Sequence, residues 1–169
     1  RPSTMALAAV IALRAVTGDA RASVEEETAT REVGEPIMAI VSIKTQQITV
    51  YDAGGWTHRA PISSGTRGRE TPAGIFAVVQ KNADHRSNLY DDAWMPHMQR
   101  LTWNGIALHG GPLPGYAASH GCVRMPYGFA EKLFDKTRIG MRVIVSPSDA
   151  APVEFAHPAL SMLNAEGVA

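Results

Sequence analysis

The alternation of apolar and polar residues from Pro36 onward predicts a series of short β-strands. Runs rich in β-branched residues are separated by polar or glycine-containing stretches, which is typical of strands joined by tight turns. The runs that we expect to form strands are 37–43, 47–51, 57–63, 75–81, 100–103, 105–109 and 141–146. The first two favour a hairpin, and Asn104-Gly105 between two apolar runs marks another.

One helix is expected late in the chain. Pro126 suits the first turn of a helix, and apolar residues at positions 129, 130, 133 and 134 have helical spacing within 127–137. Many short strands with a single helix indicate a mainly β protein with a sandwich or barrel-like architecture.

The segments outside this pattern set the expected domain boundaries. Residues 1–22 contain an apolar run and the small-x-small sequence Ala20-Arg21-Ala22, which resembles the rear part of a secretory signal. Residues 23–35 are polar and acidic and are expected to form a linker. We expect a leader and linker at 1–35, a folded domain at 36–146 and a C-terminal tail at 147–169.

One internal stretch, residues 82–99, is polar and has little periodicity. A long irregular loop within a compact domain is often a lid or a binding loop, so this stretch is expected to cover a site. Its Tyr90, Trp94, Met95 and His97 are candidates either for covering a substrate or for packing the loop onto the body.

Composition excludes several classes of protein. The 169 residues fit one domain with some tail, and 16 basic and 16 acidic residues cancel, so no charge excess favours nucleic acid. Apolar runs are all shorter than the roughly 20 residues that span a bilayer. The chain has one cysteine and therefore no intrachain disulfide.

That cysteine, Cys122, follows two histidines, His109 and His120. If residues 119–123 are extended, His120 and Cys122 face the same side, because side chains alternate along a strand. A histidine near the sulfur can take the thiol proton and later give it to a leaving amine. Gly121 lets the backbone bend, so that neighbouring N–H groups can face a developing oxyanion.

Three other interpretations compete with a nucleophile. An isolated cysteine is most often a small buried side chain, although that role requires none of the flanking His, Gly and Ser. His109, His120 and Cys122 have the donor atoms of a catalytic zinc site, but the chain has no HExxH motif, no paired cysteines and no convincing carboxylate nearby in sequence. A serine hydrolase lacks support because there is no GxSxG motif.

These residues resemble the signature of the L,D-transpeptidase catalytic domain, the YkuD-like family. The signature pairs an upstream His-Gly, here His109-Gly110, with Ser-His-Gly-Cys-Val-Arg, here 119–124. The segment SSGTRGRETPAGIFAV (63–78) is similar to the family's S-x-G…T-P-x-G-x-F stretch, and residues 85–111 are similar to its lid-and-strand region. The loop between His109 and Ser119 is shorter than in many members.

The resemblance implies a β-sandwich with the cysteine at the end of a cleft and a peptidoglycan stem peptide as substrate. Cys122 would attack the carbonyl that precedes a terminal D-amino acid, expel that amino acid and form a thioester. An amine of a second stem peptide would resolve the thioester. His109 matches the proton acceptor and donor, with the Gly110 carbonyl as a candidate to orient its ring, and His120 matches the histidine on the oxyanion side.

Other motif positions have supporting or substrate-contact roles in this resemblance: Ser119, Gly110, Gly121, Arg124 and, in the lid region, Tyr90. Arg124 lies two residues beyond Cys122, where its guanidinium can bind a substrate carboxylate or form a salt bridge that fixes the loop. His58 and His85 are expected at the surface, and Thr71-Pro72 is expected to set a turn.

The sequence therefore predicts an exported cysteine acyltransferase of the cell envelope or periplasm, acting in cell-wall biogenesis and cell shape. Donor and acceptor are expected to be peptidoglycan stem peptides, with no cofactor, metal or nucleic acid involved, and the protein is expected to act as a monomer. A cysteine hydrolase of the carboxypeptidase type on the same fold and a non-catalytic wall-binding module are the alternatives.

Overall fold

The computed structural model describes residues 25–89 and 92–153. The predictions for the leader at 1–22, for Tyr90 and for the chain beyond Val153 lie outside the described residues. In chain order the elements are β1 (Glu27–Thr28), β2 (Met38–Ser42), β3 (Gln47–Asp52), β4 (Gly55–Pro61), β5 (Gly74–Ala77), β6 (Gln80–Arg86), β7 (Trp94–Arg100), β8 (Ala107–Gly110), β9 (Val123–Met125), α1 (Tyr127–Lys136) and β10 (Arg142–Ser146).

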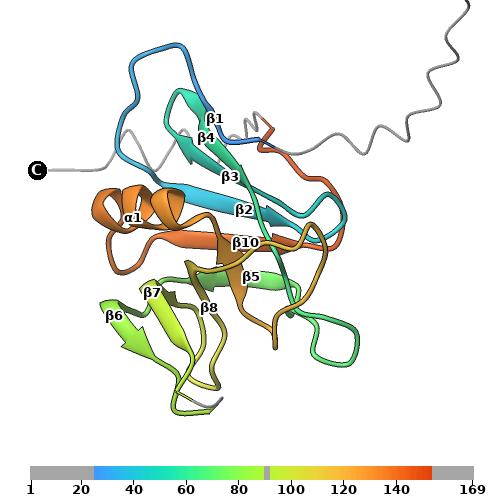
Figure 1. Cartoon of the computed structure of the whole chain (residues 1–169). Coiled ribbons are helices and arrows are strands. Elements are labelled where there is room, and N and C mark those ends of the chain that lie inside the picture. The colour runs from blue at the N-terminus through green and yellow to red at the C-terminus, as the bar shows by residue number, and fades with distance from the viewer. Residues whose placement is uncertain (1–24, 90–91, 154–169) are drawn as a thin grey trace, which may run out of the picture.

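The strands form two sheets, and α1 packs beside them (Figure 1). The larger sheet has the order β1-β4-β3-β2-β10-β5, and the smaller has the order β6-β7-β8-β9. Two pairs are parallel, β2 with β10 and β8 with β9, and the other pairs are antiparallel. The prediction of a mainly β, sandwich-like fold with one late helix is confirmed.

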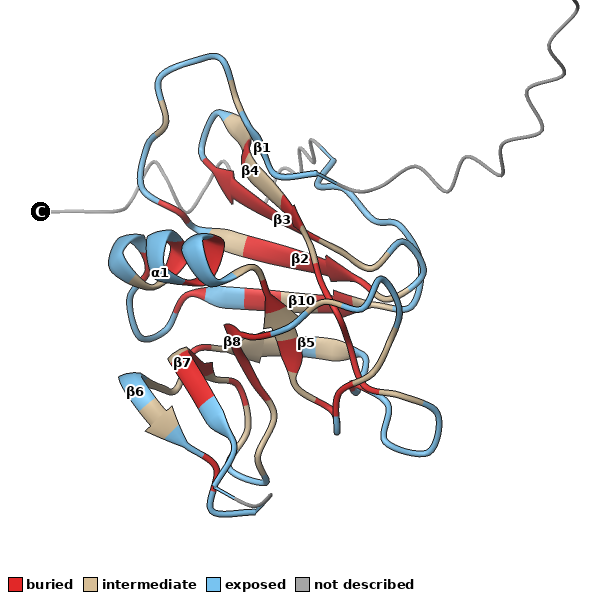
Figure 2. Cartoon of the chain, in the orientation of Figure 1, coloured by how far each residue is buried: buried red, intermediate tan, exposed pale blue. Residues whose placement is uncertain are grey.

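One hydrophobic core joins the two sheets and the helix. Its buried side chains come from the larger sheet, from β8 and β9 of the smaller sheet, and from one face of α1: Ala39, Val41, Ile48, Val50, Ala60, Leu108, Val123, Met125, Phe129, Ala130, Leu133, Val143 and Val145. Figure 2 shows these buried stretches along β2, β3, β10 and β8, with the outer face of α1 exposed. Because β8 and β9 contribute to this core from one face, their other face is available for a site.

The first predicted hairpin and the helix lie where the sequence placed them, whereas the strand predicted at 100–103 is part of a longer turn, and the strand before this turn is β7. β2 pairs antiparallel with β3, and β7 pairs antiparallel with β8 across the turn that contains Asn104-Gly105. Pro126 precedes the first residue of α1, and the helix buries Phe129, Ala130 and Leu133 at the predicted spacing. The last predicted strand is β10.

The apolar run at 75–81 is not one strand, as predicted, but parts of two. β5 ends at Ala77 in the larger sheet, and β6 begins at Gln80 in the smaller one. Between them, the Val78 N–H donates to the Met141 carbonyl at 2.9 Å, and the Val79 N–H donates to the Arg100 carbonyl at 2.8 Å. The chain thus changes sheets within two residues, a step that periodicity does not reveal.

The prediction of an irregular lid at 82–99 is wrong. Most of this stretch forms the hairpin of β6 and β7, with pairs from Gln80 opposite Arg100 to Arg86 opposite Trp94. β6 is a mostly exposed edge strand, so its polar residues need no apolar partner face. His97 has φ of 55°, which interrupts the alternation along β7 and conceals the strand from a search for period two.

The polar segment predicted as a linker, 23–35, contributes the short strand β1, which pairs with β4 through Glu27 opposite Arg59 and Thr28 opposite His58. Within 25–89 and 92–153, no helix has the length and apolar character needed to cross a membrane.

Candidate active site

The parallel pairing of β8 with β9 brings the predicted site residues onto one face of the smaller sheet. His109 lies opposite Arg124, and Leu108 lies opposite Val123. Leu108 and Val123 point into the core, so His109 and Arg124 point to the other face, together with Ala107 two residues earlier. Cys122 directly precedes β9 and packs with Ala107 in a separate small cluster.

The segment around Ser63 holds β9 on its other side. The Ser63 N–H donates to the Arg124 carbonyl, and the Arg124 N–H donates to the Ser63 carbonyl, both at 3.0 Å. The Ser63 hydroxyl also donates to the Tyr116 carbonyl at 2.7 Å and accepts from the Ala118 N–H at 3.2 Å. The family-like SSG segment is therefore a support that fixes the loop leading to Cys122.

Residues 119–122 form a bend, so the premise that 119–123 is extended is wrong. The buried Ser119 hydroxyl donates to the Cys122 carbonyl at 2.5 Å and accepts from the Gly121 N–H at 3.1 Å. Gly121 has φ of 114°, and an added Cβ would lie 2.9 Å from the Ile106 side chain. The positive φ favours glycine there, and a Cβ would also displace the end of the Ile106 side chain. His120 is exposed within this bend, so strand alternation does not place it beside the sulfur.

Thr71 ties two loops together beneath the cysteine. Its hydroxyl donates to the Gly121 carbonyl at 2.8 Å and accepts from the Gly65 N–H at 2.9 Å. Gly65 itself lies so close to the neighbouring loop that a Cβ would fall 2.0 Å from the Arg69 carbonyl oxygen. The sequence analysis predicted only a turn at Thr71-Pro72. The family-like T-P-x-G-x-F motif was the feature that could have pointed to these two hydrogen bonds.

Cys122 is a half-buried thiol in the free protein. Its S–H donates to the Gly105 carbonyl at 3.2 Å, and it packs with Met95, Met98 and Ala107. Burial raises the pKa of the thiol, while a backbone hydrogen bond from Ala107 and the positive charges of Arg100 and Arg124 act in the opposite direction. Burial is the largest of these effects, so the resting sulfur is protonated at neutral pH.

His109 is buried, with 7% of its surface exposed. Its Nδ1 lies 2.8 Å from the Gly110 carbonyl, the contact expected from the sequence. A carbonyl can only accept, so Nδ1 carries the proton and Nε2 keeps a free lone pair. Burial is the main cause that lowers the pKa of His109 to about 4. The hydrogen bond to Gly110 raises this pKa, and the charges of Arg124 and His85 lower it further. The ring is thus neutral at pH 7 and can act as a base through Nε2.

Arg124 and the glycines after His109 fit against one another. A Cβ on Gly111 would lie 3.2 Å from the Arg124 side chain, and a Cβ on Gly110 would lie 3.0 Å from the Tyr127 ring. Arg124 is half-buried and has no salt-bridge partner among the described carboxylates. Its guanidinium is therefore not used to fix the loop by an ion pair, the second role considered for it.

The sequence analysis did not recognise Arg100 as part of this site, or Gln80 and His85 as its partners. Arg100 Nε donates to the Gln80 side-chain oxygen at 2.7 Å, and its Nη2 lies 3.4 Å from His85 Nε2. His85 was predicted at the surface, but it is half-buried, and burial and the Arg100 charge lower its pKa. No motif marks these residues: Gln80 and Arg100 lie at the ends of predicted strands, and His85 lies in the stretch predicted to be a loop.

Of the four candidate lid residues, the three that the structure describes, Trp94, Met95 and His97, contact the body, which is one of the two roles considered. Trp94 stacks on Tyr127 with ring centroids 6.1 Å apart, and His97 lies edge-on to Phe134 of α1 at 5.6 Å. Met95 is buried in the cluster beside Cys122.

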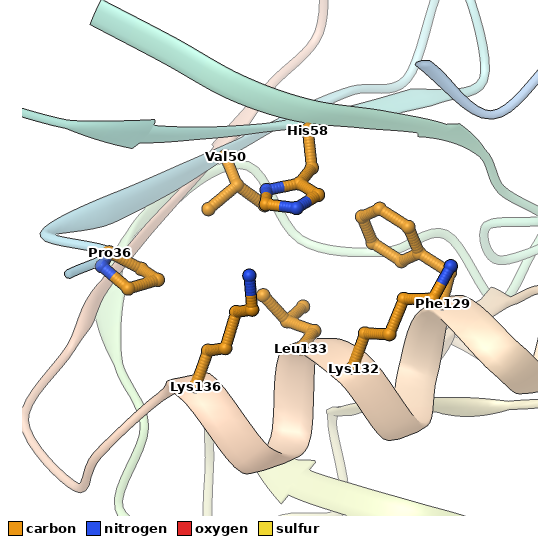
Figure 3. A pocket seen from close by; sticks show the side chains of 7 residues that line it. All are labelled: Pro36, Val50, His58, Phe129, Lys132, Leu133 and Lys136. Carbon is orange, nitrogen blue, oxygen red and sulfur yellow. The ribbon is translucent and has the colours of Figure 1, made fainter. Parts of the chain in front are cut away.

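A small hollow lies on a different part of the molecule, under α1. Figure 3 shows the hollow between the sheet, which contributes His58 and Val50, and α1, which contributes Leu133 and Lys136. His58 is half-buried rather than at the surface, and burial lowers its pKa, followed by the charges of Lys136 and Lys132. None of the residues around Cys122 lines this hollow.

The zinc alternative gains no support from the geometry. Among residues 25–89 and 92–153, no three His, Cys, Asp or Glu side chains are grouped as metal ligands.

Comparison with known families agrees with this arrangement of residues. The family model described as the L,D-transpeptidase catalytic domain (YkuD) matches residues 36–145. The chain belongs to the L,D-transpeptidase catalytic domain family. The matched range includes His109, Cys122 and the supporting segment 63–78, so the resemblance inferred from the sequence is confirmed.

Individual relatives are similar at moderate identity. L,D-transpeptidase 1 of Mycobacterium tuberculosis is 30% identical over 133 residues, which cover 69% of this chain and 53% of that protein. A crystal structure of an L,D-transpeptidase from M. tuberculosis H37Rv is 25% identical with a TM-score of 0.62, covering 66% of this chain and 58% of the other. A structure of an L,D-transpeptidase in complex with imipenem is 26% identical with a TM-score of 0.60, covering 67% and 60%. The chain therefore spans somewhat more than half the length of these relatives.

Proposed function

We propose that the protein is an L,D-transpeptidase that acts on peptidoglycan stem peptides through a thioester on Cys122, with residues 36–146 as the catalytic unit. One observation carries the proposal: the only thiol of the chain lies on the same sheet face as a buried, neutral histidine whose Nε2 is unprotonated. Residues two apart on neighbouring strands have Cα atoms about 8 Å apart, a span that a thiol and an imidazole can close.

In the acylation step, Cys122 Sγ attacks the carbonyl that precedes the terminal residue of the donor peptide. The thiol proton passes to His109 Nε2, and the Gly110 carbonyl stabilises the imidazolium through Nδ1–H. The C–N bond then breaks, and His109 returns the proton to the departing amine. A thioester and a free amino acid result.

In the transfer step, an amine of a second stem peptide attacks the thioester. His109 takes a proton from this amine as the new amide forms, and the proton returns to the sulfur as the C–S bond breaks. The free enzyme is restored without a cofactor in this proposal.

Stabilisation of the tetrahedral oxyanion is assigned to the bend at 119–122. The backbone N–H of Cys122 lies directly after Gly121, whose positive φ is held by hydrogen bonds to Ser119 and Thr71. His120 is placed on this side by family resemblance. Removal of one oxyanion donor typically slows acyl transfer by about 100-fold or more.

The reaction is tested with a purified tetrapeptide-bearing stem peptide, as donor and acceptor, and mass analysis of the products. We expect a cross-linked dimer with the wild type and none with Cys122→Ala. Trimmed monomers without dimers would mean that water resolves the thioester and would favour the hydrolase. Equal product from the two proteins would contradict a role for Cys122, and no product, with no acylation, would favour a wall-binding module.

A strained β-lactam offers a second, substrate-independent test of the nucleophile. Because a relative of this fold is known in complex with imipenem, we expect imipenem to acylate this protein at Cys122. Intact mass and peptide mapping locate the adduct, and His109→Asn is expected to slow its formation. An adduct on another residue, or one that persists in Cys122→Ala, would contradict the assignment.

The cellular setting follows from the substrate. Peptidoglycan stem peptides lie in the cell envelope, so we propose that the protein acts there, in the periplasm, in wall biogenesis and the maintenance of cell shape. A monomer suffices, because every group used above comes from one chain.

A further inference from the structure

Arg100 belongs to a row of residues that lie side by side on neighbouring strands of the smaller sheet, and this row ends at Cys122. Arg100 of β7 lies opposite Ala107 of β8, and Gln80 of β6 lies opposite Arg100. Because Val123 pairs with Leu108, the preceding residue, Cys122, continues this row next to Ala107. One residue with a small side chain, Ala107, therefore lies between Arg100 and Cys122 across the sheet.

The Arg100 side chain is held in place by neutral groups. Gln80 accepts from Nε, His85 Nε2 lies beside Nη2, and the Trp103 ring centroid lies 5.9 Å from the guanidinium carbon. Among the described carboxylates, none forms a salt bridge with Arg100. A half-buried, oriented arginine without an anionic partner is a site for an anion that the substrate brings.

We propose that Arg100 binds the free carboxylate of the donor's terminal residue, and so restricts acylation of Cys122 to peptides that end one residue beyond the attacked carbonyl. This inference rests on the proposed function and adds its specificity-determining residue. Only three bonds separate the attacked carbonyl carbon from that carboxylate carbon, a distance within about 4 Å. Cα atoms two strands apart are about 10 Å apart, which an arginine side chain and this short spacer span together.

Arg124 is the other unpaired arginine on this face, and its position differs. Its stem lies against Gly111, in the row of His109 rather than that of Cys122. Arg100 is also the larger of the two positive influences on the thiol. We therefore assign carboxylate recognition to Arg100 and use Arg124 as the comparison.

The first experiment needs no knowledge of the natural substrate. Iodoacetate and iodoacetamide both transfer their carbon to the sulfur and release iodide, but only iodoacetate carries a carboxylate. The ratio of their rates with Cys122 cancels any change in the fraction of thiolate, and so reports the anion site alone. We expect Arg100→Gln to lower the iodoacetate-to-iodoacetamide ratio about tenfold or more, Arg100→Lys to lower it less, and Arg142→Gln, on the other sheet, to leave it unchanged.

The second experiment compares donor peptides that end in a free carboxylate or in an amide. We expect the wild type to be acylated faster by the acid than by the amide. Arg100→Gln should lower this ratio of rates by at least about tenfold, because it slows acylation by the acid only. An unchanged ratio in both experiments, or a loss in Arg124→Gln instead of Arg100→Gln, would overturn the assignment. If neither peptide acylates Cys122, the proposed function fails, while the reagent ratio still decides the anion site.

Discussion

Thr71 offers a sharp test of how the fold positions the nucleophile. Its buried hydroxyl is the link between the Gly65 N–H and the Gly121 carbonyl, and Gly121 directly precedes Cys122. Thr71→Val keeps the shape of the side chain but removes both hydrogen bonds. A buried N–H and a buried carbonyl then lose their partner, and each such group costs about 1–3 kcal/mol.

The expected loss in unfolding free energy follows from these two groups. Two unsatisfied groups together destabilise the fold by about 2–6 kcal/mol. The added buried methyl stabilises it by slightly less than about 1 kcal/mol. We expect Thr71→Val to lose about 1–5 kcal/mol. Thr71→Ser keeps the hydroxyl and loses only a methyl, at about 0.5–1.5 kcal/mol.

Two measurements on the full chain test this reasoning. Urea unfolding followed by tryptophan fluorescence gives the two losses in stability. The rate of Cys122 acylation at a temperature where both variants are folded gives the effect on the site, and we expect Thr71→Val to be at least about tenfold slower than Thr71→Ser. A valine variant as stable and as fast as the serine variant would mean that this hydroxyl neither stabilises nor positions the bend.

Three further predictions concern the site. His109 has a pKa of about 4 in the folded protein, below the usual 6.5, so the unfolded chain takes up the proton first as the pH falls. The free energy of unfolding should therefore decrease between about pH 6.5 and 4, by at most about 3 kcal/mol. Urea titrations at several pH values should show a smaller decrease in His109→Asn. Position 121 has φ of 114° and a close contact to Ile106, so Gly121→Ala should destabilise the fold by about 1–3 kcal/mol. Nothing lies within 4 Å of a Cβ at position 128 on α1, so Gly128→Ala should stabilise the fold by up to about 1 kcal/mol. Equal changes in thermal stability would contradict backbone strain in Gly121→Ala. Alkylation of Cys122 by iodoacetamide should accelerate steadily from neutral to alkaline pH, since burial raises the thiol pKa, and a rate that is already maximal at pH 7 would show a resting thiolate.

The sequence predicted those parts of the fold whose physics is local. β2, β3 and β10 are short runs rich in β-branched residues that are largely buried, and α1 buries apolar residues at helical spacing. β6 and β7 were missed because one is an exposed edge strand and the other is interrupted at His97. In both strands, tertiary pairing decides the structure and not the residue pattern.

The parts of the site that could be predicted are those marked by residues of a short sequence motif. The single thiol, the upstream histidine and the glycine before the thiol mark a candidate nucleophile, and the Gly110 contact of His109 was expected. The bend at 119–122 was not predicted, because the Ser119 hydroxyl competes with strand formation through hydrogen bonds that span only two or three residues. Arg100 could not be found from the sequence, since only the sheet register brings it into the row of Cys122.

The two pKa shifts at the centre of the site have one physical cause and one consequence for catalysis. Burial disfavours charge on both groups, so it raises the pKa of Cys122 and lowers that of His109. The free protein therefore holds a neutral thiol and a neutral imidazole, and in the proposed mechanism charge develops only as the thiol proton moves to His109 and the sulfur attacks a carbonyl. Fixed positive charges and N–H groups that face the sulfur then act mainly on the transition state, which is where stabilisation accelerates a reaction. In the proposed mechanism the bound donor supplies the carbonyl, so these groups act when the acyl group is transferred and not in the free protein.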